Sequence, residues 1–600
     1  MGPYHLHFDN SSRNELVLSL NFTTKEPEQV YEFFAKSNES AEDQDTILSF
    51  CFDHVRIPRL RIPSGDTSSE AAFETLKSWI TRCQEEHTLC RRPVHNMLPR
   101  RVLEIDSIEP LRVRLVEDGA RREGLLDDDY ACLSHRWGPK TESNSLKGSN
   151  LGLYKTGVPE SKFGPLIRDA IIAIFRLGLR LVWIDCFCII QDSIEDWELE
   201  AANMGRIYEN AFLTIAASPD QENYGMFSTL SKEFEAFQVM EIEGESIYIR
   251  RKLPHPLRRI FRAVCPQDPL LKRGWVFQER WLSNRFIHFT GNEIFWECRE
   301  GIWCECLSEN IMWAEQLEKV GNSRTICKRG WNFIIQEYIG TDLSFEEDKL
   351  PAIAGIARRY AKLCGGWTYL SGLWKEDLPS ALKWRKHWYG ARDPRPLVQV
   401  APTWSWACLP HGDNIWTWRI KGHIPLVKHT ISPPGADVYA GARSAEITVE
   451  APTLDVQVYR ESPGELIGKH QNGFFLIWAD FKPDPDDETK FRAIPNDSSC
   501  LLLLLYPDED EEELAHDDVH GIVLMQQNSR VDADGKDVKF ERIGLLNTGG
   551  DVYVDDGYAE HYRGGPFPWL VDRDIIDDDQ AGYTFHWLVK RAKKRRVTLV

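Results

Sequence analysis

The chain has 600 residues, of which 42% are hydrophobic and 11% aromatic, and it carries a formal net charge of -20. This is the composition of a folded protein, and a single core stops growing at roughly 250–300 residues, so we expect two or more domains. Nucleic acid and anionic membranes carry phosphate charges that repel a chain of this sign. A nucleic-acid-binding protein is therefore not expected.

The cysteine content and the apolar runs bear on location. Fourteen cysteines are scattered through the chain without a secreted framework, which favours reduced thiols. The opening "MGPYHLHFDNSSR" has no secretory segment, and the longest apolar run, 500–506, is far shorter than the roughly 20 residues that span a bilayer. We expect a cytoplasmic protein without a membrane span. The basic run "KRAKKRR" at 590–596 is either a signal for nuclear entry or the exposed edge of the last segment, and we favour the edge.

Residues 1–125 are predicted to form a polar leader that ends in one helix, "AAFETLKSWITRCQEEHTLC". Helical spacing places Cys83, His87 and Cys90 on one face of this helix. Structural zinc sites have four ligands, usually drawn from two separated pairs, and no fourth ligand is evident in the sequence. We therefore expect these residues to pack into a core and to hold no metal.

Residues 126–300 are predicted to form an α/β domain, because short apolar runs alternate with helical periods. Near-continuous apolar strands separated by helices imply a parallel sheet that is covered on both faces. Ligands of such sheets bind beyond the carboxyl ends of the strands. The predicted elements are, in chain order, a strand at 130–138, a helix at 164–178 that ends at Gly178, a strand at 179–190, a helix beginning near Ser193 and a strand at 212–218.

The remaining segments complete the predicted domains. "RGWVFQERWLSNRFIHFTGNEIFWEC" at 273–298 reads as a short helix from about Trp275 to Leu282, followed by a hairpin that turns at Gly291 and Asn292. Residues 301–600 hold helical stretches, tryptophan clusters and strand-like runs, so a C-terminal Trp-rich domain of α+β or β-rich type is expected.

Three blocks of the α/β domain occur in the order seen in a known family. They are "YACLSHRWG", "WIDCFCIIQDSIEDWELEAANMGRIYENA" and "RGWVFQERWLSNRFIHF", and over about residues 126–300 the chain resembles the fungal HET (heterokaryon incompatibility) domain. The resemblance implies non-self recognition between fused fungal cells and a trigger of programmed cell death. It implies as partners either other copies of the chain or another incompatibility protein. The first block departs from the family, which more often has a tyrosine at the position of His135.

The HET domain is in turn similar to TIR domains, which implies a TIR-like or flavodoxin-like parallel sheet. Some TIR domains cleave NAD⁺ at the nicotinamide-ribose bond with a glutamate in a Trp-x-x-Glu setting, and "WELE" at 197–200 has this spacing. The resemblance thus implies NAD⁺ as a substrate, and no cofactor is expected.

The helical phase of the second helix singles out Glu200. At about 100° per residue, Glu200 falls at about 300° from Trp197, inside the stripe that includes Met204, whereas Glu195 and Glu198 fall on the opposite side. A carboxylate in such a stripe must be paired, coordinated or protonated. In one account Glu200 forms a structural salt bridge with Arg136, Arg273 or Arg285. In the other account it stabilises the positive charge that forms as nicotinamide leaves.

Polar residues at the strand ends and on the short helix are the candidates for the rest of the site. Asp185 is the second catalytic candidate, or alternatively a cap for the following turn. Gln278 and Glu279 rank below Glu200, because a plain amphipathic helix exposes one of them to solvent. Trp137 packs in the core or stacks on a base. The predicted substrate-binding residues are Ser134, Arg136, Trp137, Arg273 and Gln278.

Two functions follow from this sequence. The domain is either an enzyme that hydrolyses NAD⁺ or a non-enzymatic module that assembles or docks onto a partner. The surroundings of Glu200 distinguish them, because an accessible cleft favours chemistry and a closed arginine pair favours a scaffold.

Overall fold

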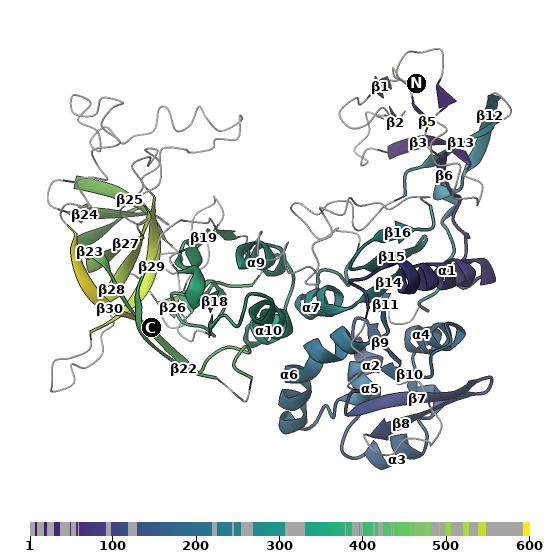
Figure 1. Cartoon of the computed structure of the whole chain (residues 1–600), viewed down its shortest axis with the longest axis horizontal. Helices are drawn as coiled ribbons and strands as arrows, with labels where there is room; N and C mark the ends of the chain where they lie inside the picture. Colours follow the sequence, from purple (N-terminus) through teal and green to yellow (C-terminus); the bar gives the residue numbers. More distant parts are fainter. Residues whose placement is uncertain are drawn as a thin grey trace. The chain divides into compact units, whose positions relative to one another are not determined.

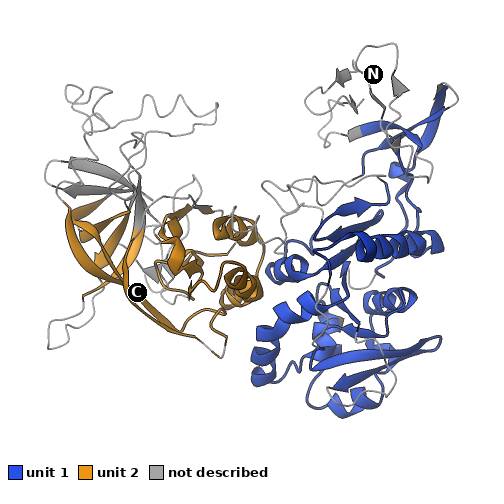
Figure 2. Ribbon diagram, in the orientation of Figure 1, with its two compact units in different colours: residues 1–326 blue, residues 327–600 orange. Residues whose placement is uncertain are grey.

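The protein, seen here in a computed structural model, has two compact units, residues 1–326 and residues 327–600 (Figures 1 and 2). The structure describes residues 6–8, 17–20, 29–36, 48–49, 56–57, 59–91, 98–117, 129–218, 225–242, 245–253, 268–306, 330–378, 380–386, 395–396, 400–411, 415–417, 424–433, 435, 437–462, 465–470, 473–479, 491–492, 498–505, 520–526, 538–547 and 592–600.

An eight-stranded sheet, in the order β16-β15-β14-β11-β9-β10-β7-β8, is the centre of the first unit. The four inner strands, β14, β11, β9 and β10, run parallel, and each edge carries an antiparallel pair of strands. The strands are β7 (Arg101–Ile108), β8 (Leu111–Glu117), β9 (Tyr130–Ser134), β10 (Leu181–Trp183), β11 (Leu213–Ala217), β14 (Arg285–Phe289), β15 (Ile294–Cys298) and β16 (Ile302–Cys304).

The α/β class predicted from the sequence is confirmed, including the parallel pairing of β9 with β10. The sheet as a whole is mixed, however, because its edge strands are antiparallel. The strands β7 and β8, at 101–117, lie in the segment predicted to be only a leader and one helix, so that description of residues 1–125 is wrong. The first five residues of β7 are all buried, and the apolar residues of both strands belong to the core of the unit.

Helices cover both faces of this sheet. Figure 1 shows α6 and α7 on one side of the strands and α1 and α4 on the other. The parallel strands are buried along their whole length for this reason. The helices are α1 (Glu70–Glu86), α2 (Pro139–Asn144), α3 (Leu151–Thr156), α4 (Pro165–Arg176), α5 (Asp185–Cys188), α6 (Ile194–Asn210) and α7 (Gly274–Leu282).

Capping residues set the ends of the helices that frame the site. Ser193 accepts a hydrogen bond from the amide of Asp196 and starts α6, as predicted. Gly178 follows the end of α4 with a φ of 89°, a left-handed conformation that favours glycine. The helix α1 ends at Glu86, so His87 and Cys90 lie in the turn beyond it and not on the helix face that was predicted.

A second sheet in the first unit joins strands that are far apart in the sequence. It runs in the order β1-β2-β3-β13-β12, and β6 pairs with β3. The strands are β1 (Leu6–Phe8), β2 (Val17–Leu20), β3 (Gln29–Lys36), β6 (Arg59–Leu60), β12 (Phe237–Ile242) and β13 (Glu245–Arg251), and β4 (Leu48–Ser49) pairs with β5 (Arg56–Ile57).

The described residues of the second unit include a large sheet and the helices α9 (Trp331–Ile339) and α10 (Ala354–Leu363). Aromatic rings pack together around Trp331 and Trp374, whose ring centroids lie 5.4 Å apart. The large sheet holds β22 (Leu426–Ser432), β23 (Ser444–Ser462), β24 (Glu465–His470), β25 (Gly473–Ala479), β27 (Ser498–Leu505), β28 (His520–Gln526), β29 (Lys539–Asn547) and β30 (Lys593–Leu599). Three two-stranded sheets comprise β17 (Tyr369–Leu370), β18 (Leu373–Trp374), β19 (Trp384–Lys386), β20 (Arg395–Pro396), β21 (Ile415–Thr417) and β26 (Phe491–Arg492).

The basic residues near the end of the chain take part in this sheet. Lys594 and Arg596 pair with Glu450, and Arg595 pairs with Asp455, so cross-strand ion pairs account for these charges. Among the helices that the structure describes, none has both the length and the apolar character needed to cross a membrane.

Candidate functional site

Glu200 lies in a closed ion-pair cluster with Arg101 and Asp196. Its side chain is 3% exposed and that of Arg101 only 1%. The Arg101 guanidinium donates to Glu200 Oε1 at 3.4 Å, to the carbonyl of Cys188 at 2.7 Å, and to the carboxylate of Asp196. The cluster therefore joins β7 to α6 and to the end of α5.

The inward position predicted for Glu200 is confirmed, but its predicted partners are wrong. The arginine is Arg101 of β7, in place of Arg136, Arg273 or Arg285. The buried stripe of α6 also lies one residue away from the prediction, because Asp196 is buried and Trp197 is 39% exposed. Glu195 and Glu198 are exposed, as predicted.

The pKa values of the two carboxyl groups in this cluster are shifted in opposite directions. Burial raises the pKa of Glu200 above its usual value, and the charge of Arg101 only partly opposes this effect. Burial also acts on Asp196, but hydrogen bonds from Arg101 and from the amide of Ile190 outweigh it and lower the pKa of Asp196. Asp196 is thus the main anionic partner of Arg101, and the closed arrangement favours a structural role for Glu200.

A second group of polar residues lies at the carboxyl ends of the inner parallel strands. Ser134 is the last residue of β9, Asp185 follows β10 closely, and Glu279 of α7 faces both. We call this group the strand-end cluster. It comprises Ser134, His135, Trp137, Asp185, Arg273 and Glu279.

Hydrogen bonds and charges hold the strand-end cluster together. Trp137 Nε1 donates to Asp185 Oδ2 at 2.8 Å, and Arg273 donates to the carbonyl of His135 at 2.6 Å. His135 Nδ1 lies 3.8 Å from Asp185 Oδ1. Asp185 Oδ1 also accepts from the amide of Cys186 at 2.7 Å in the first turn of α5, although the N-cap of this helix is Ile184.

Glu279 has the most unusual environment in the cluster. Burial raises its pKa to about 7, and the nearby Ser134 side chain opposes this effect. The negative charge of Asp185 raises the pKa further and the positive charge of Arg273 lowers it. A carboxyl group with this pKa exchanges a proton near neutral pH, which suits it to act as a general base or acid.

The strand-end cluster reaches solvent, whereas the Arg101 cluster does not. The side chain of Asp185 is 22% exposed, and Trp137 and Arg273 are half-buried. Glu279 is buried, with 6% of its surface exposed, and it lies close enough to Asp185 and Arg273 to feel their charges.

Most of the predicted substrate-binding residues come together here. Ser134, Trp137, Arg273 and the catalytic candidate Asp185 belong to the strand-end cluster, while Arg136 is exposed and Glu200 belongs to the Arg101 cluster. Gln278 and Glu279 are both buried, so the expectation that α7 exposes one of them is wrong.

Three groups of side chains in the described part of the chain have the residue types of metal ligands. His135, Asp185 and Cys186 form one group, and Glu293, Cys304 and Cys306 form another, with three members each. The third group contains Cys83, His87, Cys90 and a fourth residue, Cys298. The expectation that these residues lack a fourth partner is therefore wrong.

Comparisons with known proteins gave one match. The model of the family described as "Heterokaryon incompatibility protein (HET)" matches residues 130–279. This range begins at β9 and ends at Glu279, so it contains every residue of the strand-end cluster. A search of curated proteins and a search of solved structures found no match.

Proposed function

We propose that the chain acts in heterokaryon incompatibility, since the HET family model matches residues 130–279, and that it hydrolyses NAD⁺ at the strand-end cluster with Glu279 as the catalytic carboxyl. One observation carries the proposal: a buried carboxyl group with a pKa of about 7 lies at the carboxyl ends of parallel strands. Ligands of open α/β sheets bind at this edge, and a pKa near the working pH suits proton transfer.

The order of the inner strands supports a TIR-like or flavodoxin-like relationship. Numbered along the chain, β9, β10, β11 and β14 lie in the order 2-1-3-4, which begins the order 2-1-3-4-5 of flavodoxin-like sheets. The chain reverses direction across the sheet beside β9, and such switch points hold the ligands of these folds. Ser134 ends this strand.

The proposed reaction breaks the bond between C1′ of the ribose and the nicotinamide nitrogen. The electron pair of that bond goes to the nicotinamide, which leaves as a neutral ring, and positive charge develops on the ribose. The ionised form of Glu279 stabilises this charge, and then takes a proton from the water that attacks C1′. The half-buried charge of Arg273 suits a contact with the pyrophosphate, and the ring of Trp137 suits stacking on a base.

Glu200 has a different part in this proposal. It helps to fix α6 against β7, because its carboxyl group pairs with the buried Arg101. Tyr208 of the same helix contributes to the environment of Glu279, and its hydroxyl donates to the carbonyl of Leu133 at 3.3 Å. The Arg101 cluster is thus a positioning element behind the strand-end cluster.

The test is release of nicotinamide from NAD⁺ by the purified full chain at high protein concentration. We expect Glu279→Gln to abolish release while the protein stays folded, because the variant keeps the shape and loses the exchangeable proton. Glu198→Gln, at an exposed position of α6, is the matched control and should keep full activity. A folded Glu279→Gln variant with unchanged activity would remove the basis of the proposal.

A second candidate function is docking onto a partner without catalysis. It is favoured by apolar side chains on the outer side of α6, where Ile194 is 74% exposed and Leu199 47%. In this case cell death in fungal cells that express the chain would survive Glu279→Gln. Death would instead be lost on Ile194→Asp, which places a charge on the apolar face.

A further inference from the structure

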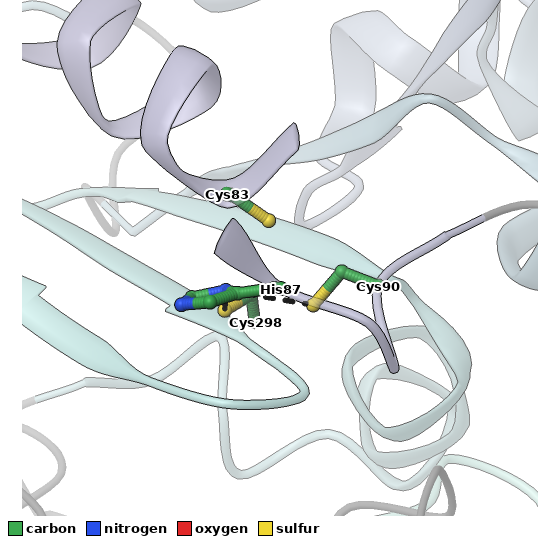
Figure 3. A group of neighbouring side chains, drawn as sticks. All are labelled: Cys83, His87, Cys90 and Cys298. Carbon is green, nitrogen blue, oxygen red and sulfur yellow. Dashed lines mark hydrogen bonds between the residues drawn. The ribbon is translucent and has the colours of Figure 1, made fainter. Parts of the chain in front are cut away.

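Four side chains with sulfur or imidazole groups converge on the face of the large sheet that α1 covers. Cys83 lies in the last turn of α1, His87 and Cys90 lie in the turn that follows, and Cys298 ends β15. Figure 3 shows the four side chains pointing toward one another. Their ligand atoms all lie within 4.8 Å of one another, and Cys83, Cys90 and Cys298 are fully buried.

The distances fit the edges of a tetrahedron around one metal ion. With metal–sulfur bonds of about 2.3 Å and a metal–nitrogen bond of about 2.1 Å, the ligand atoms of a tetrahedral zinc site lie about 3.6–3.8 Å apart. His87 Nδ1 lies 3.3 Å from the sulfur of Cys298 and 3.8 Å from that of Cys90. Small shifts of the side chains are thus enough to complete the coordination.

We propose that Cys83, His87, Cys90 and Cys298 bind a structural zinc ion. Three thiolates and one imidazole form one of the usual ligand sets of closed zinc sites. Soft thiolate ligands in tetrahedral geometry favour zinc over the oxygen-seeking cations. With four protein ligands no position is open to water or substrate, so the ion stabilises the fold and takes no part in a reaction.

A buried arginine supplies the positive charge that balances the net negative charge of such a site. Zn²⁺ with three thiolates and a neutral imidazole carries one negative charge, and Arg285 lies beside it with 4% of its surface exposed. Arg285 Nε donates to the sulfur of Cys83 at 3.3 Å, and the other guanidinium nitrogens donate to the carbonyls of Phe212 and Cys90. Such outer contacts orient and stabilise metal ligands.

The surrounding chain fixes the ligands in place. Arg285 and Cys298 are directly paired across β14 and β15. The imidazole of His87 stacks on Trp303 with ring centroids 5.5 Å apart, and Glu300 accepts a hydrogen bond from the amide of Leu89 in the ligand turn. The ligands thus come from two segments about 200 residues apart, and the ion would clamp α1 and its following turn onto the sheet.

This inference is independent of the proposed hydrolysis, and metal analysis tests it directly. We expect the full chain, purified under reducing conditions without chelator, to contain about one zinc per chain. Cys298→Ser and Cys83→Ser should each lower the zinc content to less than about a tenth of this value. Cys364→Ser, a half-buried thiol of the second unit, is the matched control and should retain the zinc.

Cobalt on the unaltered chain keeps the inference testable if the variants fail to fold. Replacement of the metal by Co²⁺ should give the intense visible absorption of tetrahedral cobalt together with thiolate-to-cobalt charge transfer. Either of two results would overturn the inference: absence of zinc with no tetrahedral cobalt spectrum, or zinc that survives in both folded ligand variants. A disulfide among the four residues would also overturn it, and would lower the thiol count of the denatured chain by two from 14.

Discussion

Glu200 and Glu279 lie on neighbouring helices, α6 and α7, and both are buried, yet their surroundings differ. Glu200 faces a buried arginine that it shares with Asp196. Glu279 faces Ser134 and Tyr208, with Asp185 and Arg273 acting at longer range. Burial alone therefore does not distinguish a functional carboxyl group from a structural one. The two kinds of carboxyl group differ in how neighbouring residues balance the charge.

The Arg101 cluster is closed to solvent, whereas the strand-end cluster is partly exposed to it. In the Arg101 cluster two carboxyl groups share one buried cation inside the core, and the exposed Arg100 also pairs with Asp196. In the strand-end cluster the charges of Asp185 and Arg273 are partly solvated, so a substrate can alter their balance. Substitutions in the two clusters should accordingly differ in kind, with losses of stability in the first and changes of activity in the second.

The largest effect is expected from Arg101→Met. This change leaves Glu200 buried without a cation and Asp196 with only the exposed Arg100, and breaking a buried ion pair costs roughly 3–5 kcal/mol. We expect the free energy of unfolding of the first unit, measured by denaturant titration, to fall by about this amount. Arg100→Met is the matched control.

Arg100 also pairs with Asp196, at 3.1 Å, but its side chain is 52% exposed. Its removal should cost about 0–1 kcal/mol, because solvent screens an exposed pair. Equal losses for the two variants would show that the Arg101 cluster is not closed in solution, and the contrast between the two glutamates would then disappear.

The second prediction concerns the pH dependence that Glu279 gives to stability. Its pKa in the folded state, about 7, lies above the usual 4.5, so the folded state binds this proton more tightly than the unfolded state does. The stabilising contribution is complete below pH 4.5 and is lost as the pH rises through 7. Its full size is on the order of 3 kcal/mol.

A comparison of Glu279→Gln with the unaltered chain isolates this effect from other titrating groups. The difference in free energy of unfolding between the two proteins should change across pH 4.5–7.5, with the unaltered chain losing stability relative to the variant as the pH rises. A difference that stays constant over this range would mean that Glu279 has an ordinary pKa. It would then be a poor candidate for proton transfer.

The sequence predicts local features of this fold well. The apolar runs identify β9, β10 and β11, while Ser193 and Gly178 mark helix ends, because each signal is carried by adjacent residues. The strands β7 and β8 escape prediction, although the alternation of apolar and charged residues in β8 is typical of a half-buried strand. Arg101 belongs to β7, so a prediction that lacks this strand also lacks the true partner of Glu200.

The features that the sequence does not predict depend on contacts between segments that are far apart in the chain. Helical phase places Glu200 inside the protein, but it contains no information on which cation is nearby. The ligand Cys298 is separated from Cys90 by most of the domain, and only the pairing of β14 with β15 brings it to the end of α1. The sequence of α7 resembles a surface helix and so gives Glu279 little weight, whereas the helix is covered on nearly all sides.

The third prediction compares Glu200→Gln with Glu279→Gln directly. Burial already favours the uncharged form of Glu200, and glutamine keeps its shape and an acceptor for Arg101, so we expect a loss of about 1 kcal/mol in stability. Nicotinamide release should stay within about twofold of the unaltered chain. A folded Glu200→Gln variant without activity would reverse the assignment and make Glu200 the catalytic carboxyl.

The last prediction concerns two small shifts of opposite sign in the pKa of Glu279. Asp185 raises the pKa of Glu279 and Arg273 lowers it, after the larger effects of burial and Ser134. Asp185→Asn removes a nearby negative charge and keeps an acceptor for Trp137, so the pKa of Glu279 should fall. Arg273→Met removes a positive charge, so the same pKa should rise.

If Glu279 must be ionised to act, the acidic limb of the pH profile of kcat/KM moves to lower pH in the first variant and to higher pH in the second, each by a fraction of a pH unit. A nonspecific loss of packing would lower the whole profile without moving the limb. Shifts of the same sign in both variants would show that another group controls the limb, and the proton would then have to be assigned elsewhere in the strand-end cluster.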